Sequence, residues 1–215
     1  MAILIPSILS KQADEVHEKI QLLEAVPGLT TVHIDFADGK FVDNQLVSAK
    51  EIGRLDTRLE LEAQLMVANP QTWFHDLEVL GYKTVFVHFE AFAGHEQVQN
   101  ALYSIRHLNM RAGLAINPNT DIEVFDWFIG DVDELLLMGV TPGYQGQPLD
   151  ENLFVRLSAL RKKHKDVIIE VDGGVKLENF AMVAAEGADK LNVGSGIWHA
   201  KDPKHRIKEF LETLK

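Results

Sequence analysis

Eight short apolar runs recur along the chain, and stretches with helical periodicity separate them. The runs are Ile3 to Leu9, Thr31 to Phe36, Leu59 to Met66, Thr84 to Phe89, Ala112 to Ile116, Glu134 to Met138, Val167 to Val171 and Lys190 to Val193. Their length and β-branched content are typical of buried strands. Eight strand–helix units in 215 residues favour a (β/α)8 TIM barrel, an α/β fold, as a single domain over residues 1–215. An open doubly wound sheet, which also alternates strands and helices, is the second candidate.

Helical periodicity between these runs predicts where several helices begin. Ser10 is a candidate N-cap for a helix whose inward face carries Val16, Ile20 and Leu23. Asp150 and the Asp202-Pro203 pair are candidate starts of two later helices. The inward faces of the other predicted helices carry Val98, Leu102 and Ile105; Leu153, Leu157 and Leu160; and Ile207, Phe210 and Leu214.

Charge and composition narrow the possible partners. The net charge is -11, so a nucleic-acid backbone would be repelled, whereas a small phosphorylated ligand can still bind at a locally positive site. There are no cysteines, which excludes thiolate metal sites and a cysteine nucleophile. No apolar run approaches the roughly 20 residues of a membrane span, and no signal peptide is recognisable at the start. We therefore expect a cytoplasmic protein with no nucleic-acid or membrane partner, and leave open whether it forms a homo-oligomer.

Polar side chains fall on the inward face of several predicted strands. Inward residues alternate with outward ones in a barrel, so His33 shares its face with Asp35. The same alternation groups Glu62, Gln64 and Met66, pairs His88 with Glu90, and pairs Glu170 with Asp172. We expect these residues at the C-terminal ends of the strands, where barrel active sites lie. The structural alternative is a buried polar network that only fills the top of the barrel.

An ordered set of motifs carries a resemblance that runs nearly the whole length of the chain. The motifs are Pro6-Ser7-Ile8-Leu9, His33-Ile34-Asp35, Asp38-Gly39-Lys40-Phe41-Val42, Leu65-Met66-Val67, His88-Phe89-Glu90, Asn117-Pro118-Asn119-Thr120, Val140 to Gln147, Val171-Asp172-Gly173-Gly174, Gly187-Ala188-Asp189 and Gly194-Ser195. In this order they resemble the ribulose-phosphate 3-epimerase family.

The resemblance implies a reaction and the residues that perform it. Members of that family hold a divalent metal with two histidines and two aspartates, and the aspartates also act as acid and base. By resemblance, Asp35 and Asp172 take the acid–base roles, and His33 is a metal ligand. Opposed carboxylates suit the inversion of a carbon beside a ketone, because one removes a proton and the other returns one to the opposite face. Ribulose 5-phosphate is then the first candidate substrate.

Further residues are assigned to substrate binding by the same resemblance. Met66 and Met138 match methionines that line the reacting carbon, and Ser7 and Asn44 are weaker substrate-site candidates. Glycine-rich loops after strands six, seven and eight would bind the phosphate through free backbone N–H groups. Their residues are Gly143, Gly146, Gly173, Gly174, Gly194 and Ser195. The alternative is that these glycines only permit tight turns.

The sequence departs from the family pattern inside the expected site. Gln64 stands where the second histidine ligand belongs, and an amide oxygen is a weaker, neutral ligand. We therefore expect one divalent ion held by His33, Asp35, Asp172 and the Gln64 oxygen, bound weakly. Magnesium or manganese is favoured, with zinc and iron as further candidates. Ala37 stands where the family has a methionine, Asp43 stands in place of a proline, and Gln145 stands in place of a glycine. The effect of these three changes on the size of the pocket and on loop closure is left undecided.

Three other functions compete with this prediction. The enlarged pocket at Ala37 would suit a bulkier sugar phosphate, such as a ketohexose 6-phosphate. A sugar-phosphate-binding protein with weak or no catalysis would also fit the loss of a ligand at Gln64. Asp38 to Asp43 spells D-x-K-x-x-D, which resembles the orotidine-phosphate decarboxylase group. That motif follows the third strand in the decarboxylase group and the second strand here, so the match is weak.

Overall fold

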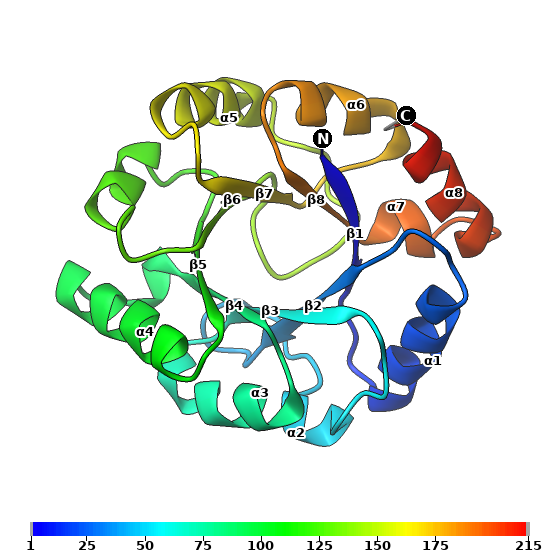
Figure 1. Cartoon of the computed structure of the whole chain (residues 1–215), viewed down its shortest axis with the longest axis horizontal. Helices are drawn as coiled ribbons and strands as arrows, with labels where there is room; N and C mark the ends of the chain where they lie inside the picture. Colours follow the sequence, from blue (N-terminus) through cyan, green and yellow to red (C-terminus); the bar gives the residue numbers. More distant parts are fainter. Residues whose placement is uncertain (1, 214–215) are drawn as a thin grey trace.

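The structure is a computed structural model that describes residues 2–213, and its centre is a closed barrel of parallel strands (Figure 1). The strands are β1 (Ile3–Ile8), β2 (Thr31–Ala37), β3 (Glu60–Met66), β4 (Thr84–His88), β5 (Arg111–Ile116), β6 (Glu134–Met138), β7 (Ile168–Asp172) and β8 (Lys190–Val193). Each strand pairs in parallel with the next, and β8 pairs with β1 from Ile3–Lys190 to Pro6–Val193. This closure confirms the predicted TIM barrel and excludes the open doubly wound sheet.

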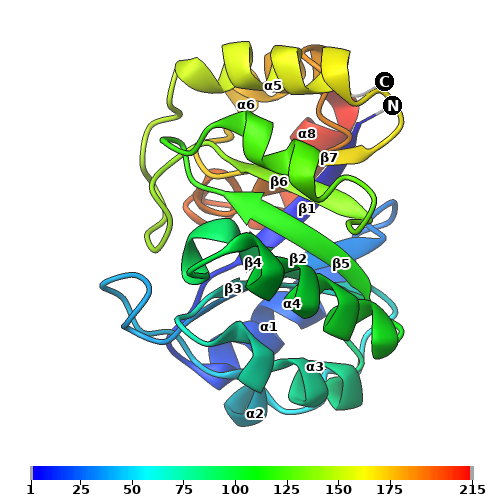
Figure 2. The same ribbon diagram turned by 90° about the vertical axis from the view of Figure 1, so that its left-hand side faces the viewer.

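Helices surround the barrel on its outside, as Figure 1 shows down the barrel and Figure 2 shows from the side. They are α1 (Ala13–Glu24), α2 (Ala49–Ile52), α3 (Phe74–Leu80), α4 (His95–His107), α5 (Asn152–Lys163), α6 (Leu177–Ala185), α7 (Ser195–Trp198) and α8 (Pro203–Thr213). Three 3-10 helices accompany them, η1 (Pro70–Thr72), η2 (Phe89–Ala91) and η3 (Ile122–Trp127). Among residues 2–213, no helix is long and apolar enough to cross a membrane.

Two of the predicted helix starts need correction. Gln12, not Ser10, is the N-cap of α1, and the Ser10 hydroxyl accepts a hydrogen bond from the Gln12 N–H in a turn that precedes the helix. Likewise Glu151 precedes α5, while Asp150 Oδ1 accepts from Asn152 N at 2.9 Å. Both side chains therefore close a turn, Ser10 two residues before the N-cap of α1 and Asp150 one residue before the N-cap of α5. The Asp202 start is confirmed, since its carboxylate accepts from His205 N at 3.0 Å. Leu214 lies outside the described residues.

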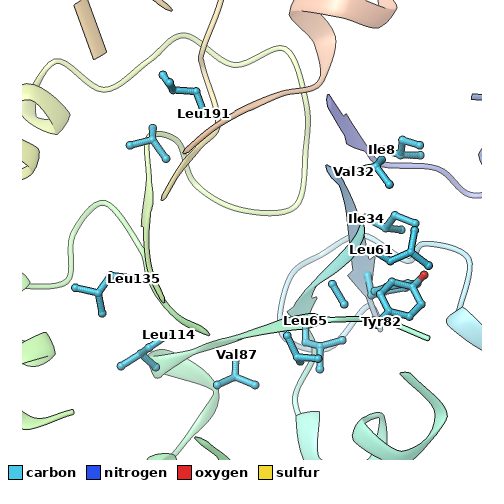
Figure 3. Packing of buried hydrophobic residues seen from close by; sticks show 14 of the residues in the cluster. Ile8, Val32, Ile34, Leu61, Leu65, Tyr82, Val87, Leu114, Leu135 and Leu191 are labelled. Carbon is cyan, nitrogen blue, oxygen red and sulfur yellow. The ribbon is translucent and has the colours of Figure 1, made fainter. Parts of the chain in front are cut away.

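The main hydrophobic core lies between the barrel and the helices (Figure 3). It is formed by outward side chains such as Val32, Ile34 and Leu61, all of them buried, as the period of two predicts. A second, smaller cluster lies inside the barrel and consists of Phe86, Ala115, Leu136 and Met138. Gly113 makes room for it, because a Cβ there would stand 2.1 Å from Phe86 Cδ1. The barrel interior thus holds a small apolar cluster from β4, β5 and β6 beside buried polar residues.

Candidate active site

Asp35, in the C-terminal half of β2, and Asp172, the last residue of β7, converge inside the barrel with His33, which was expected at the end of β2 but lies in its middle. One ligand atom from each of the three residues lies within 4.8 Å of the others. Asp35 and His33 are buried, whereas Asp172 is the last residue of β7 and is partly open to the pocket above. Ser7 donates from its hydroxyl to Asp35 Oδ2 at 2.8 Å, which fixes that carboxylate. The structure therefore brings the two predicted acid–base residues together with the predicted histidine.

The charges of these groups depend on their burial. Burial, together with the charge of Asp35, raises the pKa of Asp172 to about 8. Burial also raises the pKa of Asp35, although the charge of His33 and the Ser7 hydrogen bond act against it. Burial lowers the pKa of His33, but Glu170 and Glu62 outweigh it and hold that pKa well above its usual range. Since Glu170 Oε1 lies 3.0 Å from His33 Nδ1, that nitrogen carries a proton.

Gln64 lies at the point where these three residues meet. One terminal atom of its amide is 2.9 Å from His33 Nε2, 3.1 Å from Asp35 Oδ1 and 3.0 Å from Asp172 Oδ2. The other terminal atom is 3.0 Å from His88 Nε2. Gln64 and His88 are both fully buried. Glu90 lies in η2 and not on a strand, but the predicted pair is present, since Glu90 Oε2 is 3.7 Å from His88 Nδ1 while Glu90 Oε1 accepts from Asn117 N at 2.8 Å.

The donor set fits a divalent cation. An imidazole nitrogen and two carboxylates around one point are ligands that zinc, manganese, iron and magnesium all accept, and an amide oxygen suits the harder of these ions. Three acceptors so close together inside a protein also need a cation or a hydrogen-bond donor between them. The site therefore has the composition of a metal centre in which one ligand position is held by an amide.

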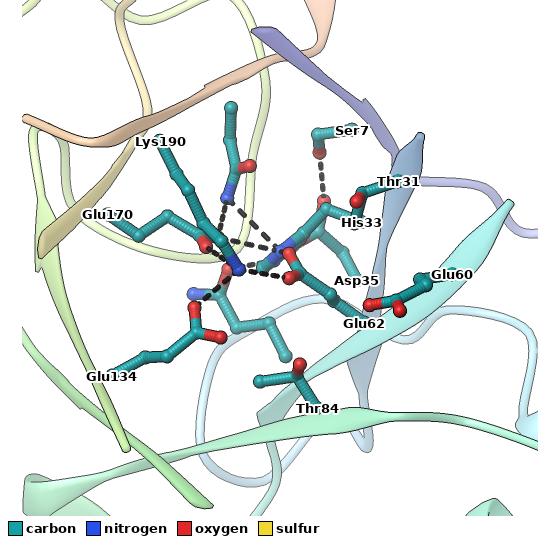
Figure 4. Close-up of polar contacts among 12 residues, drawn as sticks. Ser7, Thr31, His33, Asp35, Glu60, Glu62, Thr84, Glu134, Glu170 and Lys190 are labelled. Atoms are coloured by element: carbon teal, nitrogen blue, oxygen red, sulfur yellow. Dashed lines mark hydrogen bonds and ion pairs between the residues drawn. The ribbon is translucent and has the colours of Figure 1, made fainter. Parts of the chain in front are cut away.

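A buried ionic cluster of Lys190 and three glutamates lies next to this site, toward the N-terminal ends of the strands (Figure 4). Lys190 Nζ is 2.5 Å from Glu62 Oε1, 2.5 Å from Glu134 Oε2 and 3.7 Å from Glu170 Oε2. Glu62 and Glu170 also approach His33 Nδ1, at 3.6 and 3.0 Å, so the cluster supports the site from below.

The placement of this cluster corrects part of the sequence prediction. Glu62 and Glu170 were expected at the C-terminal ends of their strands, but each lies one inward position below Gln64 and Asp172. Sequence reasoning missed Lys190 and Glu134 altogether. The available signal was a charged residue opening an apolar run, at the first position of β8 and of β6.

A pocket opens above the carboxylates and continues to the glycine-rich loops. Its lining includes most of the predicted substrate-site residues: Ser7, Met66, Met138, Gly143, Gly146, Gly173, Gly174, Gly194 and Ser195, together with Asp35 and Asp172. Asn44 does not line it. The Asn44 amide is buried and donates to Gly143 O at 2.7 Å, so it ties two loops together. Ala37 does not line the pocket either, because it packs with Leu46 and Met66 in a small apolar cluster.

The glycine loops bring backbone close to the pocket. Gly173 and Gly174 have φ of +95° and +74°, and a Cβ at Gly174 would stand 2.6 Å from Leu149 Cα. These two positions therefore require glycine. Gln145 lies across Gly194, where its Nε2 is buried without a hydrogen-bond partner. An unpartnered donor at the edge of the glycine loops is suited to an anion.

Comparisons with known proteins agree with this geometry. The sequence matches the model of the Ribulose-phosphate 3 epimerase family over residues 3–198. It is 33% identical over 220 residues to the ribulose-phosphate 3-epimerase of Aquifex aeolicus, covering 100% of this chain and 97% of that protein. It is 32% identical to the enzyme of the same name from Bacillus subtilis, covering 95% and 96%.

Solved structures share the fold at low identity. The 3-hexulose-6-phosphate synthase of Salmonella typhimurium superimposes with a TM-score of 0.73 and 16% identity, over 98% of this chain and 97% of that one. KGPDC from Streptococcus mutans superimposes with a TM-score of 0.72 and 12% identity, over 99% and 97%. These likenesses concern the barrel alone, whereas the family match and the full-length relatives concern the sequence itself. The chain therefore belongs to the ribulose-phosphate 3-epimerase family.

Proposed function

We propose that this chain is an isomerase that interconverts D-ribulose 5-phosphate and D-xylulose 5-phosphate. The observation that carries the proposal is the convergence of Asp35 and Asp172, from β2 and β7, on one point below a pocket rimmed by glycine loops. Two carboxylates at one carbon are what epimerisation needs, because the proton leaves one face and returns to the other. Family membership and full-length relatives named as ribulose-phosphate 3-epimerases support the same substrate.

Each carboxylate has an environment suited to one half of the proton transfer. With a pKa of about 8, Asp172 carries a proton at neutral pH and can deliver it to the planar intermediate. Asp35, held by the Ser7 hydroxyl, is the carboxylate that takes the proton from carbon 3. The roles exchange in the reverse direction. Met66 and Met138 line the same pocket and exclude water from the reacting carbon.

The phosphate of the substrate would bind at the glycine loops. Gly173, Gly174, Gly194 and Ser195 all line the pocket at the ends of β7 and β8. At Gly173 and Gly174 the positive φ values and absent Cβ atoms let the backbone approach a bound phosphate closely. The pocket thus joins a phosphate cradle to the carboxylate pair.

His33, Asp35 and Asp172 would hold a divalent metal, with the Gln64 oxygen as the fourth ligand. When bound, this ion polarises the ketone and stabilises negative charge on the intermediate. Oxygen donors outnumber nitrogen donors in this set, which favours manganese or magnesium over zinc or iron. His33 is fixed for this role by Glu170, which accepts from Nδ1 and leaves Nε2 facing the site.

Other functions receive less support from the site. Ala37 is covered by Leu46 and Met66, so the space that a ketohexose phosphate would need is not opened at this residue. The decarboxylase-like motif does not reach the carboxylate pair, because Lys40 and Asp43 do not line the pocket that contains Asp35. A sugar-phosphate-binding protein without catalysis stays as the outcome if proton exchange is not found.

The proposal is tested by following the proton on carbon 3 of ribulose 5-phosphate by NMR in D₂O, with added Mn²⁺ or Mg²⁺. We expect loss of that signal as xylulose 5-phosphate appears. The Asp35→Asn and Asp172→Asn variants should each reduce the exchange by at least about 1000-fold, since each removes one acid–base group. If the wild-type protein binds ribulose 5-phosphate and shows no exchange, the proposal is wrong and the protein is a binding protein.

A further inference from the structure

We propose that the Gln64 amide takes the place of the metal ion whenever the site holds none, so that divalent ions bind weakly and exchange readily. The inference rests on the proposed function, because it concerns the same site. Its basis is that one terminal atom of Gln64 contacts all three neighbouring ligand atoms at once, at 2.9, 3.1 and 3.0 Å. These are hydrogen-bond distances.

The contacts identify which atom of the amide faces the carboxylates. As an oxygen, that atom would face Asp35 Oδ1 and Asp172 Oδ2 and be repelled by both. As a nitrogen, it donates to both carboxylates, and the amide oxygen on the other side accepts from His88 Nε2 at 3.0 Å. An amide nitrogen has two hydrogens, and Asp35 Oδ1 and Asp172 Oδ2 accept them even when Asp172 carries a proton on its other oxygen, so these two contacts take precedence over the third, to His33 Nε2. The nitrogen therefore does for the carboxylates what a cation would do.

The surroundings hold the amide at this point. Gln64 is fully buried on β3, where Asp35 is its register partner on β2. Met138 Sδ lies 3.1 Å from the terminal atom that faces His88, which limits movement on that side. For the amide oxygen to become a ligand, the group must turn by half a revolution and give up its hydrogen bonds to the carboxylates. Metal binding to this chain therefore competes with the hydrogen bonds from the Gln64 amide to Asp35 and Asp172. A histidine at position 64 has no amide group to make them.

Metal affinity and metal-free stability should both report on this competition. We would compare wild-type protein with Gln64→His and Gln64→Glu by calorimetric titration with Mn²⁺ after chelator treatment. Hydrogen bonds from the amide to Asp35 and Asp172 have to be broken in the wild type only, so we expect Mn²⁺ to bind Gln64→His on the order of 100-fold more tightly. Gln71→His, on the exposed surface of η1, controls for binding by an added histidine and should match the wild type.

Thermal unfolding in the presence of EDTA gives a second readout that does not depend on activity. The wild type should keep its Tm in EDTA, because the amide already satisfies the carboxylates. Gln64→Glu should unfold at a lower temperature in EDTA, since it places a third carboxylate at the same point, and Mn²⁺ should restore it.

Either of two results would overturn the inference: wild-type protein that retains stoichiometric metal through EDTA, or Gln64→His that binds Mn²⁺ no more tightly than the wild type. Absence of proton exchange in the wild type would instead refute the proposed function, and the binding data would still decide the role of Gln64.

Discussion

Replacing Lys190 by methionine tests whether Lys190 is the cation that holds together the ionic cluster next to the active site. Lys190 is buried at the start of β8, and its ammonium group contacts Glu62 and Glu134 at 2.5 Å. Methionine has a similar length and no charge, so the variant removes the cation and leaves the carboxylates in place. Removing one partner of a buried ion pair costs about 3–5 kcal/mol of unfolding free energy. For a chain of this size, that corresponds to a fall in Tm of roughly 10 °C.

The loss of unfolding free energy in Lys190→Met should be larger at high pH than at low pH. Burial, with the charges of Glu170 and Glu62, raises the pKa of Glu134 to about 7 even though Lys190 lowers it. A carboxyl whose pKa is higher in the folded than in the unfolded chain is stabilising when protonated, and that contribution is lost as pH rises through the folded value. Without Lys190, Arg111 Nε stays 3.2 Å from Glu134 Oε1 and His33 Nδ1 stays 3.0 Å from Glu170 Oε1, and the remaining carboxylate charge is neutralised by protons only at low pH. We therefore expect the destabilisation at pH 5.5 to be about half of that at pH 8.5.

Urea unfolding of wild type and Lys190→Met at these two pH values measures the effect. Lys204→Met, on the exposed face of α8, is the matched control and should change stability by less than about 0.5 kcal/mol. Adding Glu134→Gln to the Lys190→Met variant should recover part of the loss at pH 8.5. A loss below about 1 kcal/mol, or one that is equal at both pH values, would refute the role given to Lys190.

Three further measurements test the site and the barrel. Burial and the charge of Asp35 raise the pKa of Asp172 to about 8 in the metal-free protein, so a carboxyl titration near that pH should appear in EDTA-treated wild type and be missing from Asp172→Asn; its absence from the wild type would contradict the assignment. Gln145→Ala removes a buried hydrogen-bond donor beside Gly194, so it should raise KM and the inhibition constant of inorganic phosphate about tenfold with little change in kcat. Unchanged constants would show that Gln145 does not contact phosphate. Gly113→Ala should cost about 2–3 kcal/mol in urea unfolding, because its Cβ would meet Phe86, and Phe86→Leu should relieve that loss if the clash is its cause.

The fold could be predicted from the sequence because the strand pattern is repeated many times. A barrel strand has an apolar outward face, so runs such as Val32, Ile34 and Phe36 show the period of two without any tertiary information. The helix starts at Ser10 and Asp150 were misplaced because turn and cap use the same side-chain hydrogen bond. The choice between the two depends on backbone angles that the sequence does not contain.

The site could be predicted only in part. The positions of Asp35 and Asp172 follow from strand periodicity and from the family resemblance, and the structure brings them together. The contacts of Gln64 could not be predicted, because they depend on distances across strands that are far apart in sequence. The same is true of Lys190, whose partners come from three other strands. A single lysine at the start of an apolar run does not indicate what it faces.

The contacts between the loop after β2 and the loop after β6 should affect how fast a bound ligand leaves the pocket. Asn44 donates to Gly143 O at 2.7 Å, and the Tyr144 hydroxyl donates to Asp43 O, so the loop after β2 and the loop after β6 are joined at two points. A Cβ at Gly143 would stand 3.0 Å from Val42 Cβ, so the two loops are closely packed at this point. We therefore expect the two loops to move as one unit when a sugar phosphate leaves. We expect solvent viscosity to slow turnover if that departure is the slowest step, and Asn44→Ala to shorten the residence time of the product.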